Sequence, residues 1–232
     1  MKIVENSCLD TESKLNDTEA FYQDLYMEEP IDMDCLNAML GHINRTLSSE
    51  DTAQIMASID YNDILDDARP TPKESSPELE SIGYKIRYLF VSHPSCRDII
   101  HQVFNEAIHL AKFPTPWQAS CTVILHQKGA KNDLANYRPI TRIAADCNAF
   151  TRIMNSRVVQ VANKIITPYQ CGFLPDNAHS ASWRNPSNFA AYAVIMLDNA
   201  KAFESVHPKY LPQVLLKSGF PEAFVTYHKP LR

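Results

Sequence analysis

Apolar residues between positions 18 and 69 recur every three or four residues, which is the spacing of amphipathic helices. The residues that follow this spacing are Phe21, Tyr22, Leu25, Tyr26, Leu36, Met39, Leu40, Ile43, Leu47, Ile55, Met56, Ile59, Ile64, Leu65 and Ala68. Thr18 can cap the first helix, and Ser48 with Asp51 three residues later forms a capping-box pair. Residues 1–17 contain few apolar side chains, so we expect disorder there.

The rest of the chain mixes helical and strand spacing. Pro70, Pro72 and Pro77 predict a loop, which is the best internal boundary in the chain. The elements predicted beyond it are a helix opened by Ser95 and Asp98 and ended by Pro114, a strand over 121–125, a turn at Lys128 and Gly129, a helix over 144–166, a buried strand over 194–197 and a helix over 208–217. Pro212 fits the last helix only if that helix starts late.

Composition argues against several classes of enzyme. The six cysteines lie far apart with no Cys-x-x-Cys pair, so we expect free thiols in a reducing compartment and no zinc ribbon. The sequence has no Gly-rich phosphate loop, no Gly-x-Ser-x-Gly elbow and no His-Glu-x-x-His pattern. The first residues are polar, and the longest apolar run, Phe189 to Leu197, is about half of a bilayer span. We therefore expect an intracellular protein, nuclear or cytoplasmic, with no membrane segment.

Charge is divided unevenly along the chain. Residues 1–80 carry 5 Lys and Arg against 19 Asp and Glu, a net charge of −14, whereas residues 81–232 carry 17 against 8, a net charge of +9. A basic body behind an acidic leader favours a polyanionic partner for the body, although ordinary surface charge would give the same totals. We expect residues 81–232 to supply any nucleic-acid binding.

Asp198 stands at the end of the predicted strand over 194–197. An apolar strand that ends in a carboxylate is how polymerases hold a catalytic metal, because the strand is rigid and oxygen ligands suit Mg²⁺. Five residues later, Phe203 would place an aromatic ring beside that metal. An isolated Asp after an apolar run is more often a helix cap or a turn residue, so the neighbouring sequence decides between the two interpretations.

Six segments occur in the order found in one family. They are Phe104-Asn105 with Phe113-Pro114 and Trp117, Lys128-Gly129, Asn136-Tyr137-Arg138-Pro139-Ile140, Tyr169-Gln170-Cys171-Gly172-Phe173-Leu174-Pro175, the stretch from Ile195 through Asp198 and Phe203 to Leu211, and Leu216 to Pro221, which ends in Gly219-Phe220-Pro221. Together they resemble non-LTR retrotransposon reverse transcriptases, and the Asp198 stretch is similar to motif A of that family. Phe21 to Tyr26 and Leu47 to Asp51 look like the helical extension ahead of the polymerase. The resemblance covers nearly everything from Phe21 onward.

The resemblance implies a role for each matching residue. Asp198 would be a ligand shared by both catalytic Mg²⁺ ions, and Phe203 would be the steric gate that rejects a 2′-hydroxyl. Lys128 and Arg138 would contact the triphosphate of the incoming deoxynucleotide, because cationic side chains suit phosphate oxygens. The residues implied near template or primer are Gln170, Gly172 and Phe173. The simpler alternatives are a solvated turn lysine at Lys128, a surface ion pair at Arg138 and a core side chain at Phe173.

Several positions depart from the family pattern. The family's Ser-Ser-Pro-Gly-x-Asp-Gly loop reads Ser75 to Ser81 without its glycines, Asp176-Asn177 replaces Gly-Arg, and Arg142 replaces an apolar residue. The sequence contains no Tyr/Phe-x-Asp-Asp motif, which supplies the remaining catalytic carboxylates in the family. Two Mg²⁺ ions about 4 Å apart repel by roughly 4 kcal/mol even in water, and Asp198 alone offers one bridging anion. We therefore expect a catalytically incomplete fragment without a working two-metal site.

The expected fold is mixed α/β: the fingers and partial palm of a right-hand polymerase, preceded by a helical leader and truncated. The expected division is a disordered leader over 1–17, an acidic helical extension over 18–69, a fingers-like region over 70–190 and the start of the palm over 191–232. The partners would be an RNA template, a DNA primer and deoxynucleotides. An unpaired edge on the strand over 194–197 predicts self-association. The alternatives are a non-catalytic nucleic-acid-binding module and a decayed element with no selected role.

Overall fold

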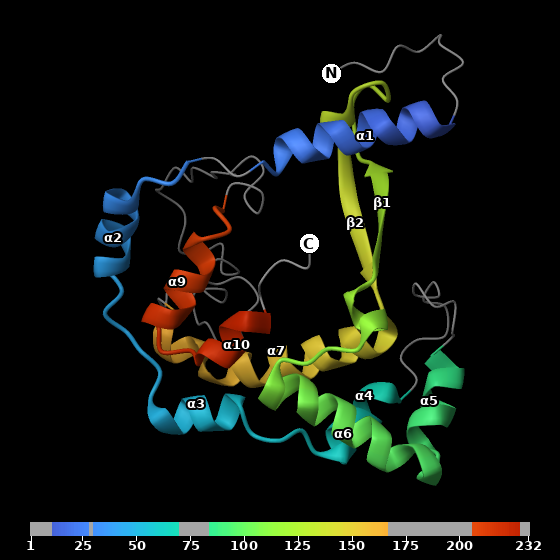
Figure 1. The fold of residues 1–232 in the computed structure, drawn as a ribbon, viewed down its shortest axis with the longest axis vertical. Coiled ribbons are helices and arrows are strands. Elements are labelled where there is room, and N and C mark those ends of the chain that lie inside the picture. The colour runs from blue at the N-terminus through green and yellow to red at the C-terminus, as the bar shows by residue number, and fades with distance from the viewer. Residues whose placement is uncertain (1–10, 28–29, 70–83, 167–205, 228–232) are drawn as a thin grey trace, which may run out of the picture.

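Helices dominate the described part of the protein, and a two-stranded hairpin extends from the group of helices that includes α6 and α7 (Figure 1). The computed structural model describes residues 11–27, 30–69, 84–166 and 206–227. The helices are α1 (Thr11–Leu25), α2 (Met33–Gly41), α3 (Ser49–Ile55), α4 (Tyr61–Ala68), α5 (Tyr84–Ser92), α6 (Pro94–Leu110), α7 (Ala145–Ile165), α9 (Tyr210–Lys217) and α10 (Glu222–Tyr227), with 3₁₀ helices η1 (Thr115–Gln118) and η2 (Leu134–Asn136). The strands are β1 (Ser120–His126) and β2 (Tyr137–Ile143).

The hydrophobic core lies where α3, α4, α5, α6 and α7 pack together, and we call these five helices the helical base. Four aromatic side chains, Phe104, Phe113, Trp117 and Phe150, contact one another with ring centroids 5.3 to 6.4 Å apart. Phe104, Trp117 and Phe150 are buried. Their burial stabilises the base because each ring removes a large apolar area from water.

The core continues across the proline-rich segment that the sequence predicts as a boundary. Ile59 and Ile64 precede that segment and lie in the same buried cluster as Phe104 and Ile153, which follow it. Asn105 joins the two parts, because its Oδ1 accepts from the Ile59 N–H at 2.9 Å and its Nδ2 donates to the Ile59 carbonyl at 3.1 Å. The change of charge at residue 80 therefore does not separate two hydrophobic cores.

Capping interactions explain where two helices of the base begin. The Ser48 hydroxyl accepts from the Asp51 N–H and the Asp51 carboxylate accepts from the Ser48 N–H, so the predicted capping box starts α3. Helix α6 begins at Pro94 and not at Ser95, where the sequence predicts it. His93 is its N-cap residue, with Nδ1 accepting from the Ser95 N–H at 3.2 Å, and proline suits the first helical position.

Two further helix starts bear on the sequence prediction. Helix α1 begins at Thr11, inside the leader predicted to be disordered, and its acidic first turn suits the positive end of the helix dipole. Thr18 therefore lies within the helix, where its hydroxyl donates to the Lys14 carbonyl at 2.8 Å instead of capping. Helix α9 starts late, at Tyr210, as Pro212 requires: the proline lies in the first turn, where no helical N–H partner is needed.

The hairpin is formed by antiparallel pairing of β1 with β2 (Figure 1). Ser120 pairs with Ile143 at the end next to α7, and His126 pairs with Tyr137 at the end next to the turn. Strand β1 extends the predicted strand by one residue at each end, whereas β2 was not predicted. Within the described residues, no helix has the length and apolar character needed to cross a membrane.

Candidate functional site

The turn between β1 and β2 is held in place by its own side chains. The His126 ring lies 3.1 Å from the Gly129 carbonyl oxygen, and Asn136 Nδ2 donates to a backbone carbonyl across the turn at 3.0 Å. The Tyr137 hydroxyl donates to the Lys131 carbonyl at 2.9 Å. Gly129 has a φ of +87°, and a Cβ there would lie 2.8 Å from the Asn136 Oδ1, so the turn needs glycine. These contacts give the turn a defined conformation.

Cationic side chains gather at this end of the hairpin. Lys128 and Lys131 in the turn and Arg138 at the start of β2 are exposed, and none of the three makes a side-chain hydrogen bond or an ion pair with another described residue. The carboxylate nearest in sequence, Asp133, is used as the N-cap of η2, where it accepts a backbone N–H at 3.0 Å. Arg142 adds a fourth cation further along β2. The hairpin therefore presents cationic side chains that suit phosphate groups.

The structure brings the two predicted triphosphate contacts to the same end of the hairpin. Lys128 lies in the turn just beyond the end of β1, and Arg138 pairs with Leu125 near the start of β2. The predicted alternative for Arg138, a surface ion pair, is not formed among the described residues. Two cations at one end of a hairpin can contact neighbouring phosphates of the same ligand, and the planar guanidinium of Arg138 can do so with two parallel hydrogen bonds.

Two arginines in the helical base, Arg87 and Arg152, are engaged in ion pairs instead. The Arg87 side chain is 5% exposed, and its guanidinium contacts Asp146 at 2.9 Å and Asp67 at 3.4 Å. Arg152 on α7 donates to both carboxylate oxygens of the same Asp67, at 2.7 and 2.8 Å. These ion pairs join α4, α5 and α7, so the two arginines stabilise the packing of the base.

Lys164 near the end of α7 is also paired with a carboxylate. Its ammonium contacts Asp51, the same residue that completes the capping box with Ser48. The hydrogen bond from Lys164, followed by those from the Ser48 side chain and backbone, lowers the pKa of Asp51 from 3.8 to about 2. Asp51 is therefore ionised at neutral pH and ties the start of α3 to α7.

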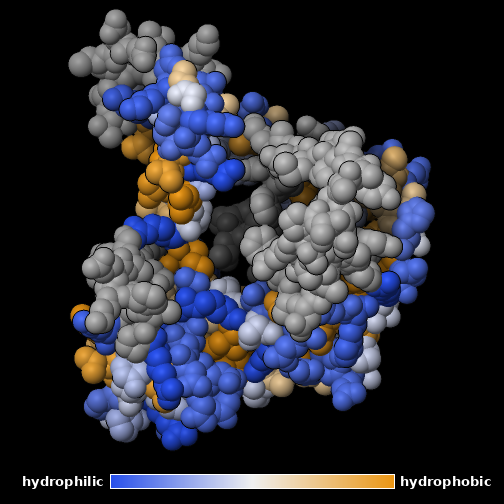
Figure 2. All heavy atoms as spheres, turned by 180° about the vertical axis from the view of Figure 1, so that it is seen from behind, coloured by the Kyte–Doolittle hydropathy of each residue, from blue (hydrophilic) through white to orange (hydrophobic). Residues whose placement is uncertain are grey.

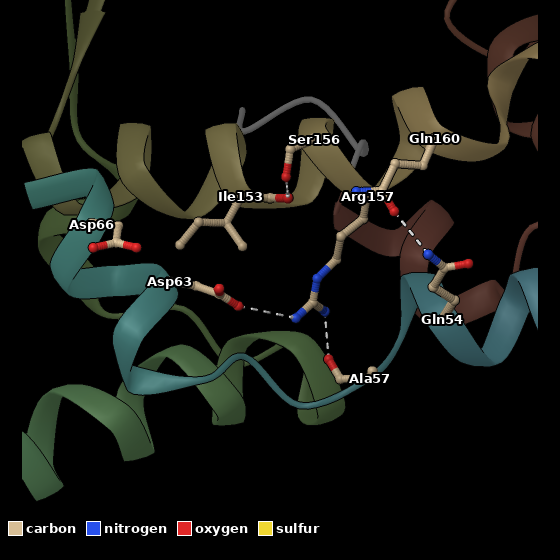
Figure 3. A pocket seen from close by; sticks show the side chains of 8 residues that line it. All are labelled: Gln54, Ala57, Asp63, Asp66, Ile153, Ser156, Arg157 and Gln160. Carbon is tan, nitrogen blue, oxygen red and sulfur yellow. Dashed lines mark hydrogen bonds and ion pairs between the residues drawn. The ribbon is translucent and has the colours of Figure 1, made fainter.

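A cleft of about 360 Å³ lies between α3, α4 and α7 (Figure 3). Figure 3 shows Arg157 reaching across it toward Asp63 and the Ala57 carbonyl. The same guanidinium donates to the carbonyls of Ile55 and Ser58, at 3.2 and 3.1 Å. Desolvation lowers the pKa of Arg157. Because the guanidinium holds the segment between α3 and α4, its role is structural.

The remaining residues of the predicted site lie outside the part of the chain that the structure describes: Asp198, Phe203, Gln170, Gly172 and Phe173. The strand predicted over 194–197, with its open edge, lies there as well. Among the described residues, no group of three or more His, Cys, Asp or Glu side chains is placed to hold a metal ion. The Mg²⁺ ligand at Asp198 therefore stays a prediction.

Two cations of the hairpin, Lys131 and Arg142, were not among the site residues that the motifs indicated. A signal for Arg142 was present in the sequence, because Arg138, Ile140 and Arg142 lie two residues apart, which is the spacing of one face of a strand. Lys131 has no such signal. It becomes a candidate only once the hairpin places it in the same turn as Lys128.

No family model matches the chain. The chain is similar to the Transposon TX1 uncharacterized 149 kDa protein of Xenopus laevis, with 24% identity over an alignment of 232 residues. The alignment covers 96% of this chain and 17% of that protein, so the chain spans about a sixth of its relative's length. The similarity relates the chain to a transposon protein, which agrees with the coarser part of the resemblance drawn from its motifs.

Proposed function

We propose that this chain is the fingers region and the start of the palm of an RNA-directed DNA polymerase, a reverse transcriptase of a non-LTR retrotransposon. In this proposal the hairpin binds nucleic acid and the phosphates of the incoming deoxynucleotide. The observation that carries it is the group of unpaired, exposed cations at the turn: Lys128, Lys131 and Arg138. The ordered motifs and the similarity to the TX1 protein support the choice of family.

The chemistry of these cations suits a phosphate ligand. Arg138 can present two parallel N–H donors to phosphate oxygens, whereas Lys128 and Lys131 act as point charges in the same turn. Binding a phosphate chain at such a cluster releases condensed counterions, and this release makes affinity depend steeply on salt. A turn held by its own hydrogen bonds loses little conformational freedom on binding, so little of the interaction energy is lost to ordering.

The proposed role of this chain is binding and not nucleotidyl transfer by itself. In motif A, Asp198 would contribute a carboxylate ligand to Mg²⁺, which polarises phosphoryl oxygens when bound. Two divalent ions held close together need several carboxylates to offset their repulsion, and the motifs of this chain supply one. The transfer step then requires carboxylates that these residues do not include.

The test compares two triple variants with the same change in net charge. The hairpin variant carries Lys128→Gln, Lys131→Gln and Arg138→Gln, and the control carries Lys85→Gln, Lys112→Gln and Lys217→Gln, three exposed lysines elsewhere. Fluorescence anisotropy with a labelled RNA template annealed to a DNA primer measures affinity from about 50 to 200 mM salt. We expect the hairpin variant to lose about tenfold or more in affinity and to lower the salt slope by about 2.

The control variant separates local contacts from overall charge. If both variants weaken binding equally, net charge alone is responsible and the hairpin is not the site. If the wild-type chain shows no salt-dependent binding at all, the alternative of a decayed element is favoured. Primer extension with Mg²⁺ tests the second half of the proposal: robust extension that disappears in Asp198→Ala would show that the chain is catalytically complete.

A further inference from the structure

The two faces of the hairpin differ in the contacts that their side chains make across the strands. On one face, the hydroxyls of Thr122 and Thr141 hydrogen-bond to each other at 2.9 Å. On the same face, the His126 and Tyr137 rings lie edge to face with centroids 5.1 Å apart. Polar side chains on this face therefore bind or contact their cross-strand partners, and we call it the hydroxyl face.

The opposite face is apolar in its centre. Directly paired residues share a face in an antiparallel ladder, so the residues on this side are Cys121, Val123, Leu125, Arg138, Ile140 and Arg142. We call it the aliphatic face. Val123 is 50% exposed, Leu125 is 55% exposed and Ile140 is 48% exposed, and Val123 pairs directly with Ile140. Figure 2 shows hydrophobic residues, in orange, between the upper end of the molecule and the helical base. These three neighbouring side chains make the aliphatic face a candidate binding surface.

We propose that the aliphatic face binds an extended single strand of nucleic acid in preference to a duplex. The inference rests on the nucleic-acid binding proposed above for the hairpin. Arg138 and Arg142 lie four residues apart on β2, about 13 Å along the strand, with Ile140 between them. A single strand that follows β2 places phosphates near both arginines while its sugars and unstacked bases cover the aliphatic side chains.

A duplex cannot cover the aliphatic side chains with its bases. Its bases are stacked inside, so it offers a flat sheet mainly phosphates and sugar edges, and the exposed area of Val123, Leu125 and Ile140 would stay in water. A single strand gains from covering this area because apolar burial is favourable and base faces are apolar. Selectivity for single strands therefore comes from the aliphatic side chains, whereas the cations attract both forms of nucleic acid.

A second copy of the chain is a poorer occupant of the aliphatic face. Face-to-face pairing of two hairpins would bring Arg138 and Arg142 of one copy against those of the other, and like charges placed together oppose association. A polyanionic strand meets the same arginines with opposite charge. Charge complementarity thus selects nucleic acid over self-association at this face.

The experiment uses matched isoleucine substitutions on the two faces in the full chain. Ile140→Thr removes apolar area from the aliphatic face, and Ile124→Thr does so on the hydroxyl face, while threonine keeps the preference for a strand. Anisotropy is measured with a labelled RNA oligonucleotide, alone and annealed to its complement. We expect Ile140→Thr to weaken single-strand binding by about fivefold and to change duplex binding by less than twofold, and Ile124→Thr to change neither.

A gain-of-contact variant keeps the test decisive if Ile140→Thr unfolds. Ile140→Tyr adds a ring on which a base can stack, so single-strand affinity should rise by about threefold or more with duplex affinity unchanged. Equal affinity of the wild-type chain for both forms would overturn the inference and leave the proposed function standing. Absence of binding to either form of RNA would contradict both this inference and the proposed function. Concentration-dependent dimerisation that Ile140→Thr abolishes, without a change in single-strand affinity, would assign the face to a second copy.

Discussion

The helical base and the hairpin both contain arginines, but these differ in burial and in ion pairing. In the base, Arg87 is buried against two carboxylates and joins α5 to α4 and α7. In the hairpin, Arg138 is exposed and has no ionic partner among the described residues. A buried guanidinium must be paired because desolvation of a lone charge costs several kcal/mol, whereas an exposed one keeps its water until a ligand replaces it. The comparison separates cations that stabilise the fold from cations available to a partner.

Carboxylates in the acidic part of the chain explain why the cations of the helical base are paired. Asp51, Asp63 and Asp67 all precede residue 80, and they pair with Lys164, Arg157, Arg87 and Arg152 of the basic part. The net charge of +9 over residues 81–232 therefore overstates the charge that a polyanion can reach, because α3 and α4 already neutralise much of α5 and α7. The described cations outside these ion pairs include the exposed Lys128, Lys131 and Arg138 of the hairpin. The acidic helices also share the core, so we expect nucleic-acid binding to require the whole chain and not residues 81–232 alone.

The largest expected effect is on the free energy of unfolding, and it compares a side chain of the core with one of the hairpin. Phe150→Ala should lower the free energy of unfolding by about 3–5 kcal/mol, because the ring is buried against Phe104, Phe113 and Trp117. Val123→Ala on the exposed face of the hairpin should cost less than about 1 kcal/mol. Urea unfolding followed by circular dichroism measures both. Similar losses would mean that the hairpin is as tightly packed as the base.

The second effect compares two arginines. Arg87→Ala leaves Asp67 and Asp146 without that cation and should cost about 3 kcal/mol in unfolding free energy, with little change in RNA affinity of the folded protein. Arg138→Ala should do the reverse, changing stability by less than about 0.5 kcal/mol while weakening RNA binding. Unfolding and anisotropy are measured on the same preparations. The distinction between the two regions fails if Arg138→Ala destabilises the protein as much as Arg87→Ala does.

The third effect concerns two glycines. Gly129→Ala should destabilise the hairpin turn by about 1–2 kcal/mol, because Gly129 has a φ of +87° and an added Cβ would meet the Asn136 side chain. Gly41→Ala is the control: it has open space around its Cβ position and should leave stability unchanged or slightly raised. Hydrogen exchange of the β1 and β2 amides reports the first change locally. Unaltered protection in Gly129→Ala would show that the turn tolerates a side chain.

Sequence patterns identified the elements that local chemistry determines. The capping box at Ser48, the long helix over 144–166, the turn at Lys128-Gly129 and the glycine after α9 are all present. At the last of these, the Phe220 and Gly219 N–H groups donate to the Leu215 and Leu216 carbonyls, which is the helix ending that a glycine with positive φ allows. Each feature depends on residues a few positions apart, which a sequence displays directly.

What the sequence did not indicate depends on contacts between distant residues. Helix α2 ends at Gly41, and the expected helical residue Leu47 is instead buried near α9, where its N–H donates to the Ser218 carbonyl at 2.9 Å. The ion pair of Asp67 with Arg152 joins positions far apart in the chain and has no local signal. For the same reason, charge totals do not indicate which cations a ligand can reach, because the packing of α4 on α7 decides which of them are paired.

The last effect is a pH dependence that distinguishes charge from packing at Asp51. Lys164, followed by Ser48, lowers the pKa of Asp51 in the folded protein to about 2, below the ordinary value of 3.8. A carboxyl with a lowered folded pKa stabilises the protein above its unfolded pKa, and this contribution is lost as the pH falls through the folded value. The stability difference between wild type and Asp51→Asn, measured as the urea midpoint, should be constant above about pH 5 and shrink from about pH 4 to pH 2. Asp66→Asn, at an exposed ion pair with Arg69, should show little difference at any pH. A difference for Asp51→Asn that persists undiminished at low pH would mean that Asp51 acts through its capping geometry and not through its charge.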